Sequence, residues 1–307
     1  MTCILYRKSS ISLAFQTNTI LRGCNLFIWY GFSDNNQQKD IIIYAKTIKA
    51  YLKADLAQFD HTCITAESAD DIVSSMVFLG RKIYNDACKR NNFAQLIVEN
   101  EYGDIVMISN QRTVIHKHFI FSNEGAFFSC SSDNPFSFFG ANPKHYILSS
   151  TTNFTNKQLN DLLDGSNNNH SVEITCIDDV TSTAITFQGN ARELPVRFSV
   201  SCRGQYPHQI HELPSIEKCS RMHGHTYKCC VSAFNSKDVI SVNNFIKALG
   251  RSIVDALNEA FLLGRVQQAT VESVARYIAI TLSQSYKLAF VELTETPNIM
   301  ARITFNE

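Results

Sequence analysis

The sequence has no excess of charge of either sign. Lysine and arginine together number 28, and aspartate and glutamate together also number 28, so the formal net charge is zero. A chain without a global field does not attract nucleic acid or an anionic membrane surface over long distances. We therefore expect no nucleic-acid partner, and any polyanionic substrate has to be held by a local group of cations.

Long hydrophobic runs and a regular cysteine framework are also missing. The segment 1–16 carries Arg7 and Lys8 in its middle and has no apolar run long enough for a signal peptide or a membrane span. The ten cysteines are scattered, unlike the evenly spaced cysteines of small secreted domains. We expect reduced cysteines, a cytoplasmic location and no membrane partner.

The sequence does have enough hydrophobic residues for ordered domains, because 45% of its 307 residues are hydrophobic, which suits two domains of ordinary size. In the N-terminal part, alternating apolar residues predict strands and a longer period predicts helices. The predicted order is strand, strand, helix, helix, strand, strand, over residues 3–16, 25–32, 40–60, 67–89, 95–101 and 105–109.

The C-terminal part repeats this order. A strand leads into residues 211–224, and the elements that follow are a return strand, two helices and a hairpin, over residues 225–234, 243–260, 271–286, 288–295 and 299–305. Matching points support the alignment: 59–61 against 257–259, 65–68 against 270–273, and 97–101 against 291–295. We interpret the chain as an α+β protein with two tandem units of one kind.

The two units leave a middle region with another composition. We expect residues 1–112 to form the first unit, 113–195 a connecting region and 196–307 the second unit. The middle region is aromatic and rich in Ser and Asn, with a short helix predicted near 156–163 and a strand pair near 172–187. It is too apolar for a flexible linker, so we expect an ordered insertion that extends a sheet or covers an edge.

One stretch of the second unit carries the pattern of a metal site. His223 and His225 are two residues apart, so both imidazoles point to one face of an extended segment. A third imidazole from His211 would complete a zinc site with an open fourth position, which is the catalytic form. Cys202 and His208 lie nearby and remain alternatives for this first ligand, while Cys219 supplies a thiol beside the pair.

The motifs of this region occur together in one known family. They are His211-x-Leu213-Pro214, Lys218-Cys219-x-Arg221-Met222-His223-Gly224-His225-Thr226-Tyr227, Thr270-x-Glu272-Ser273 and Glu295-Thr296-Pro297. This order resembles the family of 6-pyruvoyltetrahydropterin synthase and 6-carboxytetrahydropterin synthase (QueD), strongly over the last 110 residues and weakly over the first 110. The resemblance implies the tunnelling fold (T-fold), in which units of two helices and four strands join into an antiparallel barrel with active sites between neighbouring units.

The resemblance implies zinc at His211, His223 and His225, and it makes Cys219 the catalytic cysteine. Neutral imidazoles suit zinc. A catalytic thiol needs a lowered pKa, and we expect the metal together with Lys218 or Arg221 to supply the positive potential.

The family's remaining catalytic pair is an Asp-His dipeptide just after the first long helix of a unit. The second unit has Asn258-Glu259 at this position, whereas the first unit has Asp60-His61 but no zinc motif. Because the family's sites lie across a junction between units, we expect one composite site per chain, with Asp60 and His61 given by one unit and Cys219 and zinc by the other. If the dipeptide match is accidental, the protein is an inactive relative.

The resemblance also identifies residues for substrate binding. Glu295 matches the carboxylate that holds the pterin ring, since a carboxylate accepts two parallel hydrogen bonds from an aminopyrimidine edge. Thr270 and Glu272 match residues that line the same pocket, although both also fit ordinary capping of a helix start. Glu101 aligns with Glu295 but lacks the Thr-Pro that follows it, and His116 and His118 repeat the histidine spacing without a thiol or third ligand.

The expected function is therefore that of a zinc-dependent lyase of the 6-carboxytetrahydropterin synthase type, acting on 7,8-dihydroneopterin triphosphate in queuosine, deazapurine or pterin biosynthesis. The alternatives are the pyruvoyl branch, which eliminates triphosphate without loss of carbon, and an inactive zinc- and pterin-binding relative. Residues 242–245 replace an acidic, glycine-containing stretch that the family has at this place. This departure affects the assignment of the substrate rather than that of the fold. A closed barrel needs several units, so we expect a homo-oligomer, either a dimer or a trimer.

Overall fold

The architecture comes from a computed structural model of the chain. It describes residues 1–17, 21–33, 45–65, 71–101, 104–110, 113–123, 126–132, 145–150, 171–178, 183–190, 193–211, 213, 215, 217–235 and 242–305.

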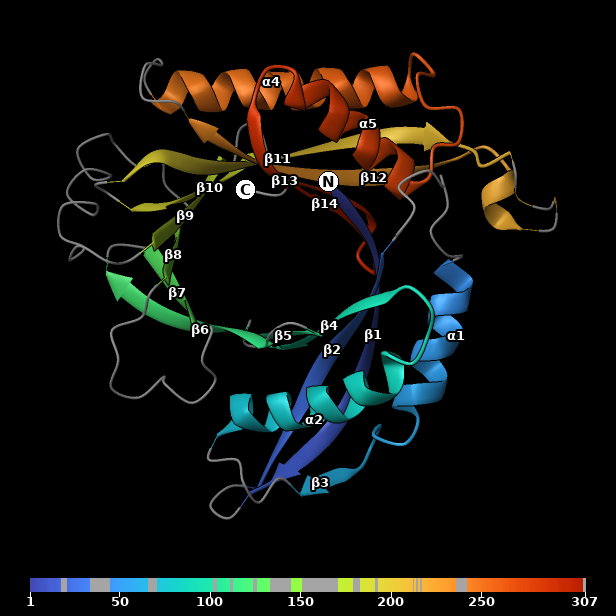
Figure 1. Cartoon of the computed structure of the whole chain (residues 1–307), viewed down its shortest axis with the longest axis vertical. Coiled ribbons are helices and arrows are strands. Elements are labelled where there is room, and N and C mark those ends of the chain that lie inside the picture. The colour runs from blue at the N-terminus through green and yellow to red at the C-terminus, as the bar shows by residue number, and fades with distance from the viewer. Residues whose placement is uncertain are drawn as a thin grey trace.

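All of the strands in these ranges belong to one sheet that closes on itself (Figure 1). Neighbouring strands are antiparallel except for β8 with β9 and the short β3, which runs parallel to β1. Closure comes from β1, which pairs with β2 on one side and with β14 on the other. In spatial order the closed strands are β1 (Thr2–Gln16), β2 (Leu21–Ser33), β4 (Phe93–Asn100), β5 (Ile105–Ser109), β6 (Thr113–Asn123), β7 (Ala126–Ser132), β8 (His145–Ser150), β9 (Ser171–Asp178), β10 (Thr183–Asn190), β11 (Glu193–His208), β12 (His223–Asn235), β13 (Lys287–Thr296) and β14 (Ile299–Thr304), with β3 (Cys63–Thr65) beside β1.

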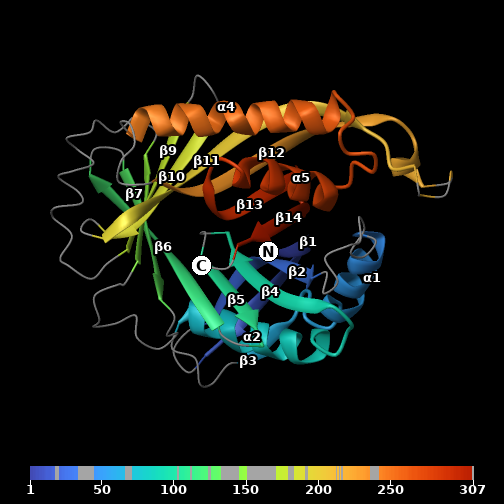
Figure 2. The same cartoon turned by 45° about the horizontal axis from the view of Figure 1, so that its top comes forward.

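Two four-stranded segments of this sheet have the same topology. Each has its strands in sequence order within the sheet, and each inserts two helices between its second and third strands. In the first segment α1 (Ala45–Leu56) packs on β1, and α2 (Ile72–Ala87) packs on β4 and β5. In the second, α4 (Val242–Phe261) packs on β11, and α5 (Val271–Ser283) packs on β13 and β14. Both helix pairs lie on the outer side of the closed sheet (Figures 1 and 2).

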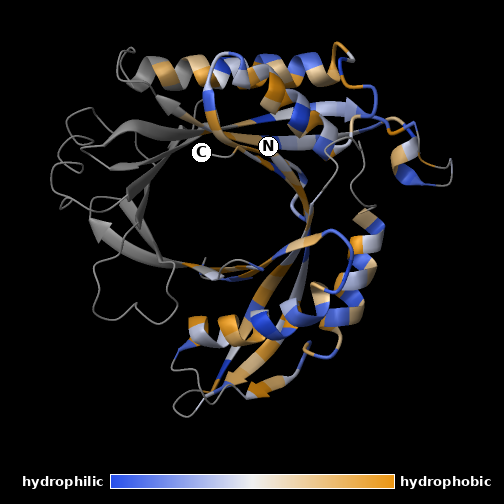
Figure 3. Cartoon of the chain, in the orientation of Figure 1, coloured by the Kyte–Doolittle hydropathy of each residue, from blue (hydrophilic) through white to orange (hydrophobic). Residues whose placement is uncertain are grey.

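The alternation of apolar residues explains why the helices sit outside. Every second side chain is buried from Ile11 to Phe15 of β1 and from Cys24 to Tyr30 of β2, so one face of this sheet is apolar and is covered by the helices. Phe15, Leu26, Ile28 and Leu79 are fully buried in this layer, which Figure 3 shows as hydrophobic strands under α2. None of the helices in the described ranges is long and apolar enough to span a bilayer.

The predicted elements of both units agree with the structure to within a few residues at their ends. The region 113–195 contributes the strands β6 to β10, which join β5 to β11 within the same sheet. The strand pair predicted near 172–187 corresponds to β9 and β10, which are antiparallel. The short helix predicted near 156–163 lies outside the described residues. The division into domains at 112 and 195 stays a prediction.

The first strand of the first segment and the last strand of the second segment meet at one seam. β14 of the second segment pairs with β1 of the first, from Thr2 opposite Thr304 to Arg7 opposite Ile299. Residues nearly 300 positions apart in the sequence therefore share one ladder of hydrogen bonds. At this seam the first half of β1 and the start of α1 lie beside the end of β13 and the beginning of β14.

The helices approach the sheet at different distances in the two segments, and this predicts opposite effects of substitution. A Cβ at Gly80 of α2 would lie 2.7 Å from Ile108 Cδ1 and 3.2 Å from Val98 Cγ2, whereas one at Gly250 of α4 would lie 3.7 Å from Val200 Cγ1. Gly80→Val should lower the free energy of unfolding by about 1–3 kcal/mol because it overpacks this contact. Gly250→Ala should raise it by about 0.5–1 kcal/mol, since alanine loses less backbone entropy in a helix. Urea unfolding followed by circular dichroism measures both.

Candidate active site at the seam

Three histidines lie together where β11 ends and β12 begins. The antiparallel register sets His208 directly opposite His223, and Tyr206 opposite His225. Opposed side chains in such a ladder are close enough to touch, and His225 points to the same face as His223. One ring nitrogen from each of His208, His223 and His225 lies within 4.8 Å of the other two.

The hydrogen bonds of two of these rings fix where their protons are. His208 Nδ1 lies 2.9 Å from the carbonyl of Ala269, and His223 Nδ1 lies 2.8 Å from the carbonyl of Arg221. A carbonyl can only accept, so both Nδ1 atoms carry hydrogen and both neutral rings present an Nε2 lone pair. These Nε2 atoms are 2.9 Å apart.

Two facing lone pairs require a positive charge between them, either a shared proton or a metal ion. Histidine ligands of metals commonly donate their other ring N–H to a carbonyl, as His208 and His223 do. Burial also lowers the pKa of His208, which keeps the ring neutral. The set of His208, His223 and His225 therefore fits a divalent ion that prefers nitrogen ligands, and zinc is such an ion.

A carboxylate completes this cluster. Glu295 Oε1 lies 3.3 Å from His208 Nε2 and 3.3 Å from His225 Nε2. The pairing of β13 with β14 shifts register between Thr294 and Thr296, so Glu295 sits at a β-bulge. Bulges redirect a side chain relative to the regular strand, and this one accompanies the turn of Glu295 toward the histidines. Burial of the carboxylate raises its pKa, against the opposing attraction of His225, His223 and Arg7.

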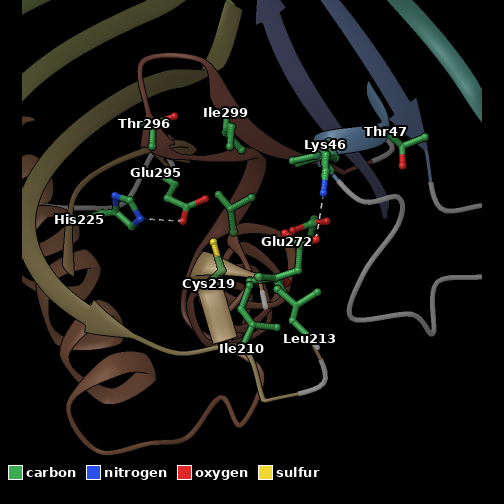
Figure 4. Close-up of a pocket in the computed structure, with 15 residues that line it drawn as sticks. Lys46, Thr47, Ile210, Leu213, Cys219, His225, Glu272, Glu295, Thr296 and Ile299 are labelled. Carbon is green, nitrogen blue, oxygen red and sulfur yellow. Dashed lines mark hydrogen bonds and ion pairs between the residues drawn. The ribbon is translucent and has the colours of Figure 1, made fainter. Parts of the chain in front are cut away.

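A cavity of about 490 Å³ opens beside the cluster (Figure 4). Figure 4 shows Cys219, His225 and Glu295 together at this cavity. Its walls come from both segments of the sheet. The first segment gives Leu5, Ala45, Lys46 and Thr47, and the second gives Ile210, Leu213, Glu217, Cys219, His225, Thr270, Val271, Glu272, Glu295, Thr296 and Ile299.

An ion pair bridges the two segments at this cavity. Lys46 Nζ of α1 lies 3.1 Å from Glu217 Oε1, which belongs to the loop before Cys219. The side chain of Lys46 is 81% exposed, so the pair is screened by water and contributes little to stability. The contributions of Leu5 and Lys46 were not predicted, because nothing in the sequence places the start of β1 and of α1 beside residues 210–299.

Cys219 lies on a short turn, η1 (Lys218–Ser220), that is anchored to the end of β11. The Ile210 N–H donates to the carbonyl of Cys219 at 2.9 Å, and Gln209 Nε2 donates to the carbonyl of Ser220 at 2.8 Å. Burial, together with the carboxylates of Glu295 and Glu217, raises the pKa of the Cys219 thiol. In the protein alone this pKa is therefore raised, and the lowering expected from a metal together with Lys218 or Arg221 depends on the positive charge that the metal would add.

Thr270 and Glu272 line the cavity as expected, and Thr270 also caps a helix. The Ser273 N–H donates to the Thr270 hydroxyl at 3.2 Å, which satisfies an N-terminal amide of α5. Glu272 lies in the first turn of the same helix, where a negative charge interacts well with the helix dipole, and it is only 4% exposed. Both residues therefore have a structural role besides any role in binding.

The structure does not bring Asp60 and His61 to this cavity within one chain. They follow the C-terminal end of α1, whereas the cavity is lined by the N-terminal end of that 12-residue helix, roughly 18 Å away along its axis. Asp60 Oδ1 accepts the Ser12 N–H at 2.9 Å, which lowers the pKa of this carboxyl, and Oδ2 lies 3.2 Å from His61 Nδ1. The His61 side chain is 82% exposed and its φ is +56°.

The histidine that lies with His223 and His225 is His208 and not His211. His208, which the sequence leaves as an alternative, joins His223 and His225, whereas His211 is exposed on the following turn and is outside this cluster of described side chains. The reason is register: only the last residue of β11 lies opposite His223. Cys202 is buried further along β11. The side chains of His116 and His118 lie outside the described residues.

Other aligned residues have local partners. Glu101 Oε2 accepts the Asn25 amide at 3.3 Å, and Glu259 Oε2 accepts the Tyr277 hydroxyl at 2.7 Å. Asn258 Oδ1 accepts the Tyr206 hydroxyl at 3.1 Å. These contacts give Glu101, Asn258 and Glu259 structural roles.

A comparison with families of known proteins supports this reading of the site. The family model described as 6-pyruvoyl tetrahydropterin synthase matches residues 196–306, which run from β11 to the end of β14 and include all three histidines, Cys219 and Glu295. No curated protein matches the chain.

The different positions of His208 and His211 predict different metal contents. His208→Ala should remove one of three nitrogen ligands and reduce bound zinc far below one ion per chain, while His211→Ala should retain the wild-type content. Elemental analysis after dialysis against a weak chelator measures both. Full zinc content in His208→Ala, or its loss in His211→Ala, would contradict the cluster.

Proposed function

We propose that the protein is a zinc-dependent lyase that acts on 7,8-dihydroneopterin triphosphate and forms a 6-carboxytetrahydropterin product. The match of residues 196–306 to the family model of 6-pyruvoyl tetrahydropterin synthase supports this proposal. The cytoplasm is the compartment we propose for it. The Cys-x-Arg-Met form of residues 219–222 is what favours the carboxy product over the pyruvoyl product.

The observation that carries the proposal is the composition of the cavity at the seam. The Cys219 thiol, the buried Glu295 carboxylate and His225, one member of the three-histidine cluster, line one cavity of about 490 Å³. A cavity of this volume suits a small bicyclic ligand, and its mixed apolar and polar walls are those of a small-molecule site. The seam between β14 and β1 lies beside this cavity, where the family's sites between neighbouring units are expected.

The chain's own residues divide the work of binding and proton transfer. In the proposed complex, Glu295 accepts two hydrogen bonds from the aminopyrimidine edge of the ring. Thr270 and Glu272 line the part of the cavity that would surround the ring. Cys219 takes a proton from the substrate side chain, which must extend toward the histidines.

His208, His223 and His225 would hold the metal ion. When bound, zinc supplies positive charge that lowers the pKa of a substrate hydroxyl and of a neighbouring thiol. This charge would oppose the effect of burial and of the two carboxylates on the Cys219 thiol. The apolar wall that includes Ile210, Leu213 and Val271 limits the entry of water to the reacting groups.

We place Asp60 and His61 of a second copy of the chain at the open side of this cavity. The pair is exposed and already oriented, with the Asp60 carboxylate holding the imidazole and the backbone of His61 in the left-handed region. Strained, exposed residues of this kind are common at functional sites. A homo-oligomer in which each chain gives Asp60 and His61 to its partner's site would complete the acid–base set.

The distance between His61 and the cavity within one chain also favours a second candidate, an inactive protein that binds zinc and pterin. Incubation with 7,8-dihydroneopterin triphosphate followed by product identification separates the possibilities. A carboxy product supports the main proposal, a pyruvoyl product supports the other branch of the family, and unchanged substrate with bound pterin supports the inactive relative.

The role of the thiol predicts a loss of turnover without a loss of metal. Cys219→Ala should reduce kcat by about 10²–10⁴-fold, the usual contribution of a positioned acid or base, while zinc content stays at the wild-type value. Cys230→Ala is a matched control, because this half-buried cysteine lies on β12 outside the cavity lining. A Cys219→Ala variant with wild-type kcat would contradict the assignment.

The shared site predicts rescue between chains. Cys219→Ala and His61→Ala should each be inactive alone, but a co-expressed mixture should recover about one quarter of wild-type activity, because random assortment pairs an intact Cys219 with an intact His61 in that share of sites. Two affinity tags allow the mixed oligomer to be purified, and in a purified mixed dimer the share of intact sites rises to about one half. An active His61→Ala variant, or a mixture without recovery, would sink the shared-site arrangement.

A further inference from the structure

Glu295 has two possible binding partners, the ring of a pterin and a metal ion held by the histidines. Its position in the sequence matches a carboxylate that holds a pterin ring, but in the structure its Oε1 atom lies 3.3 Å from both His208 Nε2 and His225 Nε2. The carboxylate thus faces the atoms that would bind a metal ion.

The geometry around Glu295 is that of a ligand set. Three neutral imidazoles leave a fourth position on a tetrahedral ion, and carboxylate oxygen is an accepted zinc ligand. Glu295 is well placed to fill that position because it is already within 3.3 Å of two of the three nitrogens. Its negative charge, buried except for 11% of the side chain, also needs a positive partner.

The same carboxylate cannot serve both partners at once. A bidentate contact with an aminopyrimidine edge uses both oxygens. The ring edge and the substrate side chain lie at opposite ends of a pterin, so a ring held by Glu295 in its present position would direct the side chain away from the histidines. Binding with the side chain toward the histidines therefore requires Glu295 to move.

We propose that Glu295 is the fourth ligand of the metal ion in the substrate-free protein, and that the ring edge of the substrate draws it away and opens the coordination position for the substrate side chain. Recognition of the ring and activation of the metal are then one event. We call the binding of Glu295 to the metal ion the ligation step and its displacement by the substrate ring the release step. The ligation step stands on the geometry of the histidines and Glu295 alone, whereas the release step rests on the proposed function.

Besides the substrate ring, the positive charge of Arg7 attracts the Glu295 carboxylate once it has left the metal ion. It lies on β1 opposite Ile299, a residue of the cavity wall, and its charge attracts Glu295. Its buried Nε has no hydrogen-bond partner among the described residues. Because Arg7 comes from the first segment and Glu295 from the second, the seam itself provides this attraction.

Zinc affinity without substrate tests the ligation step. Affinity is measured by competition with a chromophoric chelator at one fixed pH. Glu295→Gln keeps the shape and removes the charged oxygen, so it should weaken zinc binding by at least about 10–100-fold, the cost known for lesser partners of a metal site. Glu295→Asp, which keeps the charge but shortens its reach, should lie in between.

Glu217→Gln is the matched control, since it removes a carboxylate from the same cavity that pairs with Lys46. It should leave zinc affinity unchanged. Thermal unfolding of the metal-free variants checks that each is folded. Equal zinc affinity in wild type and Glu295→Gln would overturn the ligation step, and so would an equal loss in Glu217→Gln, because the effect would then be one of charge alone.

Unsubstituted pterin tests the release step, because it has the ring edge but no side chain to replace Glu295 on the metal. Saturating pterin should weaken zinc binding to the wild type and leave Glu295→Gln unaffected, and by linkage zinc should weaken pterin binding by the same factor. Pterin that binds without changing zinc affinity would overturn the release step. Failure of pterin to bind at all would overturn the release step and the proposed function together, while the zinc affinities still decide the ligation step.

Discussion

The backbone pairing of β14 with β1 is the contact on which the candidate site depends. It closes the sheet and brings the start of the chain to its end, so that Leu5, Arg7 and Lys46 lie beside the cavity and cluster built by residues 208–299. A closed sheet has no free edge at this point, which favours a single stable arrangement. Weakening this seam would separate the two walls of the cavity without touching the histidines.

The histidine cluster depends on a second constraint, the register between β11 and β12. A shift of one residue would turn every side chain of one strand to the other face, and His208 would leave His223 and His225. The carbonyls of Ala269 and Arg221 then orient the rings so that lone pairs converge. Backbone groups thus orient a histidine cluster that could hold a metal ion, and Glu295 at its β-bulge brings a negative charge to two of these rings.

Much of the fold could be predicted because the signals are local. The two-residue period of the strands, the helical period of α1, α2, α4 and α5, and the repeated order of elements all follow from neighbouring residues. The middle strands β6 to β10 have weaker patterns, and their place between β5 and β11 follows from pairing with distant strands. The duplication that the repeated order suggests remains an interpretation.

The sequence by itself determined the type of chemistry: imidazoles two residues apart, a nearby thiol and a carboxylate after a strand point to a metal-dependent small-molecule site. Only the tertiary structure decided which residues meet. It set His208 rather than His211 opposite His223, turned Glu295 onto the histidines and left Asp60 and His61 at the far end of α1. The reason is that residue type is written locally, whereas register, bulges and sheet closure arise from contacts between strands far apart in the chain.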